Sequence, residues 1–203
     1  MTIALDVASG MCWSIVYLVA IIKGFQSKTW CIPKLAICQN LSWELYIVIS
    51  GITNNSYGTG FFVQLIWLIL DIGVLLTWLL YDRDGKYAML RKLGILLCVS
   101  VVMLFPTYIL SLWELTAFAI NLIMSAAFII RFRNGGIHWR SKVIAVAKLI
   151  GTFAATILNG VIFDNKMVLW LGGLCLILDS HYCASLMSNS SIGGGKDEKN
   201  SIT

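Results

Sequence analysis

Charged residues are scarce in this chain of 203 residues, of which only 12% are Asp, Glu, Lys or Arg. Soluble globular domains carry about 25% charged residues. Apolar residues make up 59% of the chain, and the mean hydropathy is +0.83. A soluble domain of this size could not cover so much apolar surface with so few charges. The composition therefore excludes a disordered chain, a nucleic-acid-binding protein and an ordinary soluble enzyme, and it favours a protein whose partner is the lipid bilayer.

Motifs that hold nucleotides or metal ions are also lacking. The chain has no GxxxxGK, GxGxxG, HExxH, CxxC or GxSxG motif, and no DDxxD run that would bind a magnesium diphosphate. Its six cysteines follow no disulfide or zinc spacing, so we expect them to pack as small apolar side chains. We therefore expect no cofactor and no metal site.

Long apolar runs account for most of the chain. At roughly 20 residues per membrane span, they predict an all-α, polytopic membrane protein that folds as a seven-helix bundle. We expect one transmembrane domain over residues 1–188 and a disordered cytosolic tail over 189–203, which is rich in Ser, Gly and Lys. The runs are Gly10–Phe25, Ile32–Ile52, Phe61–Tyr81, Leu93–Leu112, Leu115–Phe132, Val143–Phe163 and Met167–Met187.

Seven spans place the connecting segments alternately on the two sides of the membrane. Basic residues are divided unevenly between these two sides. Thirteen fall on one side, Lys166 falls on the other, and Lys148 lies inside a span. Because cytoplasmic loops carry the excess of Lys and Arg, the N-terminus is predicted outside or in a lumen and the C-terminus in the cytosol. The thirteen are Lys23, Lys28, Lys34, Arg83, Lys86, Arg91, Lys92, Arg131, Arg133, Arg140, Lys142, Lys196 and Lys199.

Four carboxyl groups lie within the spans or at their margins: Glu44, Asp71, Glu114 and Asp179. A charged residue at the centre of a span costs at least about 2.5–3.5 kcal/mol, so such residues tend to mark function or an interior partner. Two of them have structural alternatives. Glu44 could hold helices together by hydrogen bonds, and Glu114 could be an acid placed favourably at a helix start.

Polar and aromatic side chains share helix faces with these acids. Asn40 is four residues from Glu44, and Gln64 and Trp67 precede Asp71 by seven and four residues. Lys148 either snorkels to the basic side or lines the same interior. Together these faces predict one polar, aromatic-lined cavity inside the bundle. Its expected supporting residues are Asn40, Trp43, Gln64, Trp67, Asp71, Tyr108, Trp113, Glu114, Asn121, Asn159 and Tyr182.

The segment Asn40-Leu41-Ser42-Trp43-Glu44, in the second of seven spans, resembles the N-x-x-W-E segment of the membrane-integral terpene cyclases. This family serves fungal meroterpenoid and indole-diterpene pathways and has bacterial relatives that act on prenylated indoles. Asp179 with Tyr182 matches the position of a second essential acid in the last span, and Asp71 resembles an acid of the third span. The predicted topology resembles that of the family over the whole chain, whereas the similarity of individual residues is confined to three short segments.

The resemblance implies cyclisation without a metal, started by protonation of a terminal alkene or epoxide on a prenylated substrate, either a meroterpenoid precursor or a prenyl-indole. Glu44 would be the proton donor, and Asp179 would position it, reload it or take the final proton. Hydrocarbon surroundings would keep a carboxyl group neutral and ready to donate. Aromatic faces would stabilise the carbocations by about 0.5–2 kcal/mol each.

A small proton-coupled transporter is the alternative function, because intramembrane acids are equally expected there. The sequences around Glu44 and Glu114 both contain Trp-Glu-Leu, as a three-plus-three inverted repeat would place them. A scaffold protein would not need four intramembrane acids. For the cyclase, the expected location is a bacterial plasma membrane or the fungal endoplasmic reticulum, and the oligomeric state stays open.

Overall fold

The protein is an all-helical bundle in a computed structural model that describes residues 2–82, 87–134 and 141–193. Its elements are α1 (Thr2–Ser27), α2 (Lys34–Thr53), α3 (Thr59–Tyr81), α4 (Ala88–Leu104), η1 (Phe105–Ile109), α5 (Trp113–Arg133), α6 (Lys142–Thr156), η3 (Ile157–Ile162) and α7 (Lys166–Gly193). Seven helical segments are long and apolar enough to cross a membrane, which confirms the predicted fold class.

Helix boundaries differ from the apolar runs at several places. Helix α1 starts at Thr2, eight residues before the predicted span, because a polar residue such as Asp6 can lie exposed near the helix end without interrupting the helix. The predicted fourth and sixth spans both end in single π-helical turns, η1 and η3. Helix α7 continues to Gly193, five residues past the predicted domain end at 188, and residues 194–203 lie outside the described part of the chain.

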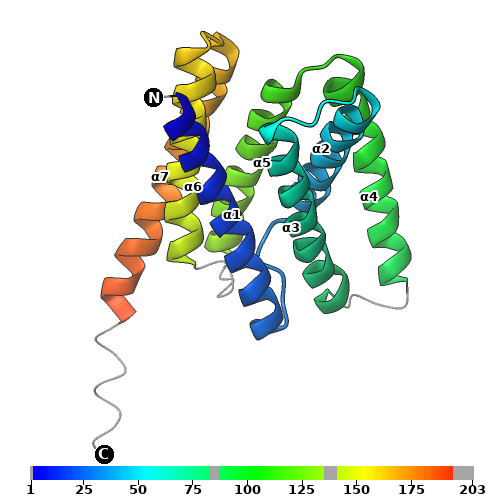
Figure 1. Ribbon diagram of the computed structural model, residues 1–203. Helices are drawn as coiled ribbons and strands as arrows, with labels where there is room; N and C mark the ends of the chain where they lie inside the picture. Colours follow the sequence, from blue (N-terminus) through cyan, green and yellow to red (C-terminus); the bar gives the residue numbers. More distant parts are fainter. Residues whose placement is uncertain (1, 83–86, 135–140, 194–203) are drawn as a thin grey trace, which may run out of the picture.

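The helices surround a central space rather than packing in one sheet-like layer. Helix α1 packs against α6 and α3, and α2 packs against α3, α4 and α5. Helix α7 covers α5 and α6 from outside (Figure 1). The interior is therefore enclosed by α1, α2, α3, α5 and α6. Helices α4 and α7 pack against the outside of this group.

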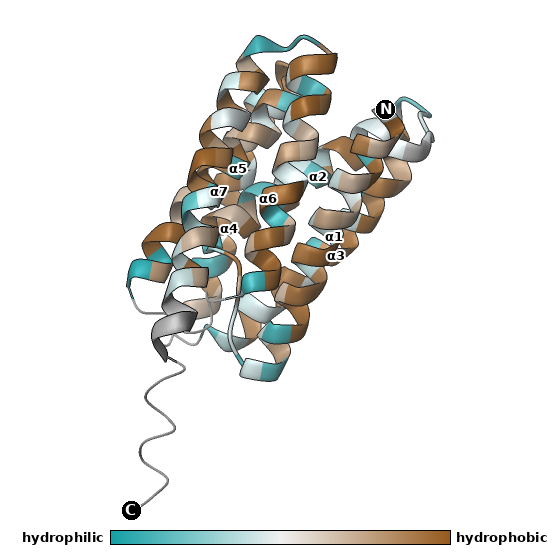
Figure 2. Ribbon diagram, turned by 90° about the vertical axis from the view of Figure 1, so that its left-hand side faces the viewer, coloured by the Kyte–Doolittle hydropathy of each residue, from teal (hydrophilic) through white to brown (hydrophobic). Residues whose placement is uncertain are grey.

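The outer surface is apolar along the helices. Ile69, Val102 and Ile177 are examples of large aliphatic side chains that are more than half exposed on different helices. Hydrophobic residues run along the helix lengths, and hydrophilic ones gather at the ends and at a few positions inside (Figure 2). Hydrocarbon is the solvent that suits such a surface. The start of α1 and the end of α7 lie at opposite ends of the bundle, as an odd number of spans requires (Figure 1).

A group of polar contacts, here called the lower clasp (Lys34, Trp78, Asp82 and Lys92), joins α2, α3 and α4 near the end of α3. Lys34 Nζ lies 2.7 Å from Asp82 Oδ2, and Trp78 Nε1 donates to the same oxygen at 2.7 Å. Lys92 Nζ donates to the carbonyl oxygens of Trp78 at 3.2 Å and of Asp82. A cation at a helix C-terminus interacts favourably with the free carbonyls there. Burial alone raises the pKa of Asp82, but the hydrogen bonds from Lys34 and Trp78, with the charges of Lys34 and Lys92, outweigh it and hold this pKa below its ordinary value.

Candidate active site

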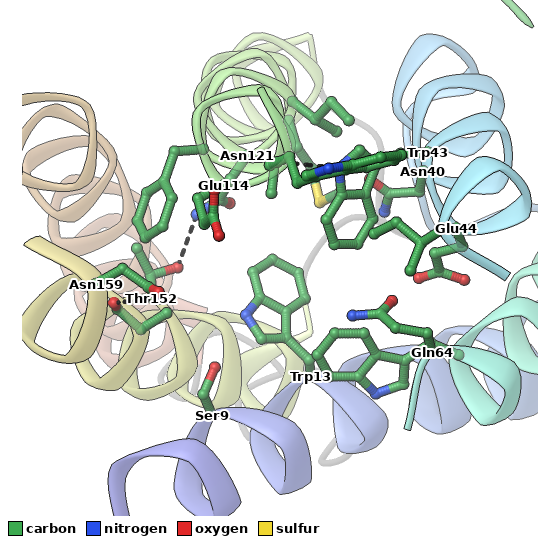
Figure 3. Close-up of a pocket in the computed structure, with 18 of the residues that line it drawn as sticks. Ser9, Trp13, Asn40, Trp43, Glu44, Gln64, Glu114, Asn121, Thr152 and Asn159 are labelled. Atoms are coloured by element: carbon green, nitrogen blue, oxygen red, sulfur yellow. Dashed lines mark hydrogen bonds between the residues drawn. The ribbon is translucent and has the colours of Figure 1, made fainter. Parts of the chain in front are cut away.

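An internal cavity of about 320 Å³ lies between five of the seven helical segments (Figure 3). Small-molecule sites typically have about 300–1,000 Å³. Among the described residues, α4 and α7 contribute nothing to its lining. The lining comprises Asp6, Ser9, Trp13, Tyr17, Asn40, Trp43, Glu44, Ile47, Gln64, Trp67, Trp113, Glu114, Ala117, Phe118, Ile120, Asn121, Met124, Thr152, Ala155, Leu158 and Asn159. Nine of the thirteen residues expected at the site therefore line one cavity.

Glu44 is the most deeply buried acid of this lining, with 1% of its surface exposed. Tyr17 of α1 donates its hydroxyl to Glu44 Oε1 at 3.4 Å, and Asn40 Nδ2 donates to the Tyr17 oxygen at 3.0 Å. Asn40 and Glu44 share a face of α2, as their spacing of four predicts. The amide acts on the acid through Tyr17, a contact that the sequence analysis missed. The signal that could have found it is a phenol inside an apolar span, because a buried hydroxyl needs a hydrogen-bond partner.

Asp71 of α3 forms a carboxyl pair with Glu44. The two carboxyl groups lie near enough to influence each other electrostatically, and Asp71 is 1% exposed. Each group also keeps one buried oxygen, Glu44 Oε2 and Asp71 Oδ2, to which no described side chain donates a hydrogen bond. Asp71 is not itself part of the cavity lining. It therefore acts on the cavity through its neighbours Glu44 and Tyr17.

Asp179 lies in a different place from Glu44. Its two carboxylate oxygens are 2.7 and 2.8 Å from Lys148 Nζ, and both side chains are almost fully buried. Lys148 also donates to Asn121 Oδ1 and Ser125 Oγ, each at 2.6 Å. Lys148 is therefore buried and does not snorkel to the surface, but it does not line the cavity either.

A closed ring of hydrogen bonds links this ion pair to the cavity wall. Asn121 Nδ2 donates to Thr152 Oγ1 at 3.0 Å, and Thr152 Oγ1 donates to Asp179 Oδ2 at 3.2 Å. Asn121 and Thr152 line the cavity, whereas Asp179 and Lys148 do not. The last-span acid thus fixes two wall residues from behind, and the structure does not bring it into the group formed by Glu44, Asp71 and Tyr17.

Four indole rings line the cavity. Trp43 Nε1 donates to the Trp113 carbonyl at 3.1 Å, and Trp67 Nε1 donates to Ser14 Oγ at 3.1 Å. Trp13 projects into the middle of the cavity (Figure 3), and its ring centroid lies 5.6 Å from Lys148 Nζ. Because the Trp43 and Trp67 N–H groups are bonded to the protein, these two rings are held in fixed positions.

Two of the expected wall residues lie elsewhere. Tyr108 is 41% exposed and stands edge-on to Trp113, with ring centroids 6.4 Å apart. Tyr182 is buried against Phe128 and Phe132 in the core between α5 and α7. Helix periodicity placed both on the correct spans, but the direction of a helix face depends on neighbours that the sequence does not specify. In the described part of the chain, no three His, Cys, Asp or Glu side chains form a group that could hold a metal ion.

Fold and cavity together define a polytopic α-helical membrane protein with an acid held in an aromatic-lined interior. Residues 2–191 match the Pyr4-like transmembrane terpene cyclases, and the chain belongs to this family. It is similar to a Pyr4-family terpene cyclase, mfmH, of Annulohypoxylon moriforme, with 28% identity over 80 residues. That match covers 39% of this chain and 32% of the relative, so it spans about a third of the relative's length. No solved structure matches the chain.

Family membership confirms the resemblance that the sequence carries. It identifies the chain as a multi-pass membrane protein of a terpene cyclase family, and it favours an enzyme over the transporter that the sequence left open.

Proposed function

We propose that this protein cyclises a prenylated substrate in the cavity by protonating its terminal alkene or epoxide, with Glu44 as the proton donor. The observation that carries the proposal is the environment of the Glu44 carboxyl group. Its carboxyl group is buried, lines the cavity, is paired with Asp71 and keeps one oxygen to which no described side chain donates. Two carboxylates this close in an apolar interior do not both ionise, so the pair holds a proton to transfer.

The reaction balances without a second reagent. Glu44 gives its proton to the epoxide oxygen, whose bond to the more substituted carbon breaks, or to the terminal alkene carbon. Each cation formed is attacked by the next double bond of the chain, which forms a ring. The last cation loses a proton to a base, or is captured by a heteroatom of the substrate that then loses its own proton. The product is an isomer of the substrate, with unchanged mass.

The neighbours of Glu44 suit a group that becomes an anion during the reaction. Tyr17 donates its O–H to Glu44 Oε1, and this hydrogen bond strengthens when the carboxylate forms. Asn40 donates to the Tyr17 oxygen and so leaves the phenol proton directed at Glu44. In this proposal Asp71 shares the proton with Glu44 and returns it after the reaction.

The cavity wall suits a carbocation. Trp13, Trp43, Trp67 and Trp113 offer π faces, each of which stabilises a nearby cation by about 0.5–2 kcal/mol. Their bulk also excludes water that would quench the cation. We propose that Asp179 is a positioning residue, which acts through Lys148 on Asn121 and Thr152, rather than the proton partner of Glu44.

The test is a product assay with membranes that contain the chain, supplied with epoxidised and unepoxidised prenylated indoles and polyketides. We expect isomers of unchanged mass. Glu44→Gln keeps the shape but removes the proton and should lower turnover by about 10²–10⁴-fold, the usual contribution of a general acid. Asp71→Asn should lower it less, and Glu114→Gln, which changes an exposed acid of the same cavity, should lower it least.

Turnover by Glu44→Gln at the native rate would show that the general acid is misassigned. Because the proposed reaction begins with a carboxyl proton and not with departure of a diphosphate, we expect activity to persist in EDTA. Loss in EDTA with recovery on adding magnesium would contradict the proposal.

A further inference from the structure

Trp13 is held differently from two other indoles of the cavity. The N–H groups of Trp43 and Trp67 donate to protein oxygens, which fixes the position of those rings. Trp13 Nε1 donates no hydrogen bond to the described residues, and its ring projects into the middle of the cavity (Figure 3). The position of the Trp13 ring is therefore set by packing alone, so a change in a neighbouring side chain moves it.

Helix α6 supplies the surface against which Trp13 packs. Lys148 Nζ lies 5.6 Å from the centroid of the indole, and Gly151 follows Lys148 by about one helical turn. A Cβ atom at Gly151 would lie 3.1 Å from Trp13 Cδ1 and 3.2 Å from Trp13 Nε1, which is closer than ordinary van der Waals contact. The indole thus rests on the backbone of α6, and a larger residue at position 151 would push it toward the cavity.

Trp13 also lies along α1 between the exposed part of the lining and the acid. Asp6, an exposed residue of the lining, precedes Trp13 by about two helical turns, and Tyr17 follows Trp13 by about one. Tyr17 donates to Glu44, and the ring centroids of Tyr17 and Trp13 are 6.4 Å apart. A prenyl chain whose end reaches Glu44 therefore runs past the Trp13 ring.

The cavity is small for a long isoprenoid chain. Its volume of about 320 Å³ is at the lower end of the range of about 300–1,000 Å³ found for small-molecule sites. Tryptophan has one of the largest side chains, with a rigid ring that occupies space a ligand cannot share. Because the Trp13 indole stands in the middle of this limited space, it decides how much of a chain fits beside Glu44.

We propose that Trp13 is a specificity-determining residue that limits the number of isoprene units the cavity accepts, and that Gly151 is the positioning residue that sets where the indole lies. The proposal rests on the proposed function, because it takes a prenyl chain as the ligand. Hydrophobic pockets separate ligands that differ by one methylene by about 10–200-fold. An indole in the path of the chain is therefore sufficient to separate chains that differ by a five-carbon unit.

The experiment measures equilibrium binding of four indoles, which carry a geranyl, farnesyl, geranylgeranyl or geranylfarnesyl chain, to the detergent-solubilised protein. Glu44→Gln is the background of every variant, so that turnover does not interfere. The chain that binds most tightly defines the length optimum. We expect Trp13→Ala to move this optimum to a longer chain, because the vacated space takes up the extra unit. The first chain longer than the original optimum should gain at least about tenfold in relative affinity, and less in Trp13→Phe.

Trp170→Ala is the matched control, because Trp170 is exposed on α7 and does not line the cavity. It removes an indole of the same size and should leave the length optimum where it is. Thermal unfolding in detergent identifies any variant that fails to fold. Trp13→Phe, the smaller change, carries the test where Trp13→Ala does not fold.

Gly151→Ala tests the positioning role without altering the indole itself. The added methyl group should displace Trp13 toward the cavity and lower the relative affinity for longer chains. In the Trp13→Ala background the same substitution should have no effect on relative affinity, because the indole that it displaces is gone. A merely structural role of Gly151, through its equally close neighbour Cys12, would act alike in both backgrounds.

An unchanged length optimum in folded Trp13→Ala, or in folded Trp13→Phe where the alanine variant does not fold, would overturn the role of Trp13. An equal effect of Gly151→Ala with and without the indole would overturn the role of Gly151. Failure of the proposed function shows differently, as native turnover by Glu44→Gln or as no binding of any of the four chains.

Discussion

Tyr17 is the residue that connects the amide of Asn40 to the acid of Glu44. Its hydroxyl accepts from one and donates to the other, so it controls where the Glu44 carboxyl group points. Because it contacts the proton donor directly, we expect this side chain to act on the rate of proton transfer more than on substrate affinity.

We expect Tyr17→Phe to lower kcat by about 10–100-fold while KM changes little, since one hydrogen bond to a charged group contributes about 1.5–3 kcal/mol. The measurement is steady-state product formation, normalised to folded protein. Ser14→Ala is a useful control, because Ser14 lies on the same helix and bonds Trp67 rather than the acid. A Tyr17→Phe effect confined to KM would contradict the role assigned to the phenol.

Lys148 and Asp179 depend on each other. Lys148→Met removes the cation and leaves Asp179 buried without its charge partner, which should destabilise the protein by about 3–5 kcal/mol. Lys148→Met/Asp179→Leu removes both charges and should recover much of that loss, because replacing a buried ion pair by apolar groups is often neutral. Thermal unfolding in detergent compares the three proteins.

The double variant also tests the role of Asp179. A positioning role predicts reduced but measurable cyclisation by the folded double variant, since Asn121 and Thr152 are then held less well. Complete loss of activity at native stability would instead support direct proton transfer by Asp179.

At the scale of elements, the lower clasp ties the start of α2 and the start of α4 to the end of α3. Its ionised carboxylate is Asp82, which has 3% of its surface exposed and lies outside the spans. The pKa of Asp82 is lower in the folded protein than in the unfolded chain, where it is about 3.9. The stability that this contributes is therefore complete above about pH 4 and is lost as the pH falls through the folded pKa.

We expect the apparent Tm to fall on acidification below about pH 4, and to fall less for Asp82→Asn than for the native protein. At pH 7 the variant should be the less stable of the two. Unfolding curves recorded in detergent from about pH 7 to about pH 3 check both statements. If Tm changed with pH in the same way for both proteins, Asp82 would contribute nothing to the pH dependence of stability.

The π-helical turn η3 is a second feature at this scale. It carries Asn159, which donates to the Ala155 carbonyl at 3.0 Å, and it places Leu158 and Asn159 in the cavity lining. Single π turns inside helices occur frequently at functional sites. The regular helical period cannot predict such a turn, because the extra residue in a π turn changes the helix face on which every later residue lies.

At the scale of the whole molecule, the direction of the bundle in the membrane decides which end of the cavity faces which solution. The uneven division of basic residues predicts that the C-terminus is cytosolic. The start of α1 lies at the opposite end of the bundle (Figure 1), and the second turn of this helix carries the cavity-lining Asp6.

A reporter fused after Thr203 should therefore be active only if it works in the cytosol, and one fused before Met1 only if it works outside or in a lumen. Activity of the opposite pair would contradict the predicted orientation of the bundle.

Composition and spacing alone determined that this protein resides in lipid, that it has seven spans and that Asn40 and Glu44 share one helix face. These properties are local or summed along the chain, so the sequence carries them directly. Tertiary structure decided which acids meet. Glu44 pairs with Asp71 because α2 packs against α3, whereas Asp179 pairs with Lys148 because α7 packs against α6. The rotation of each helix about its axis is set by packing against its neighbours, and no pattern within a single span specifies it.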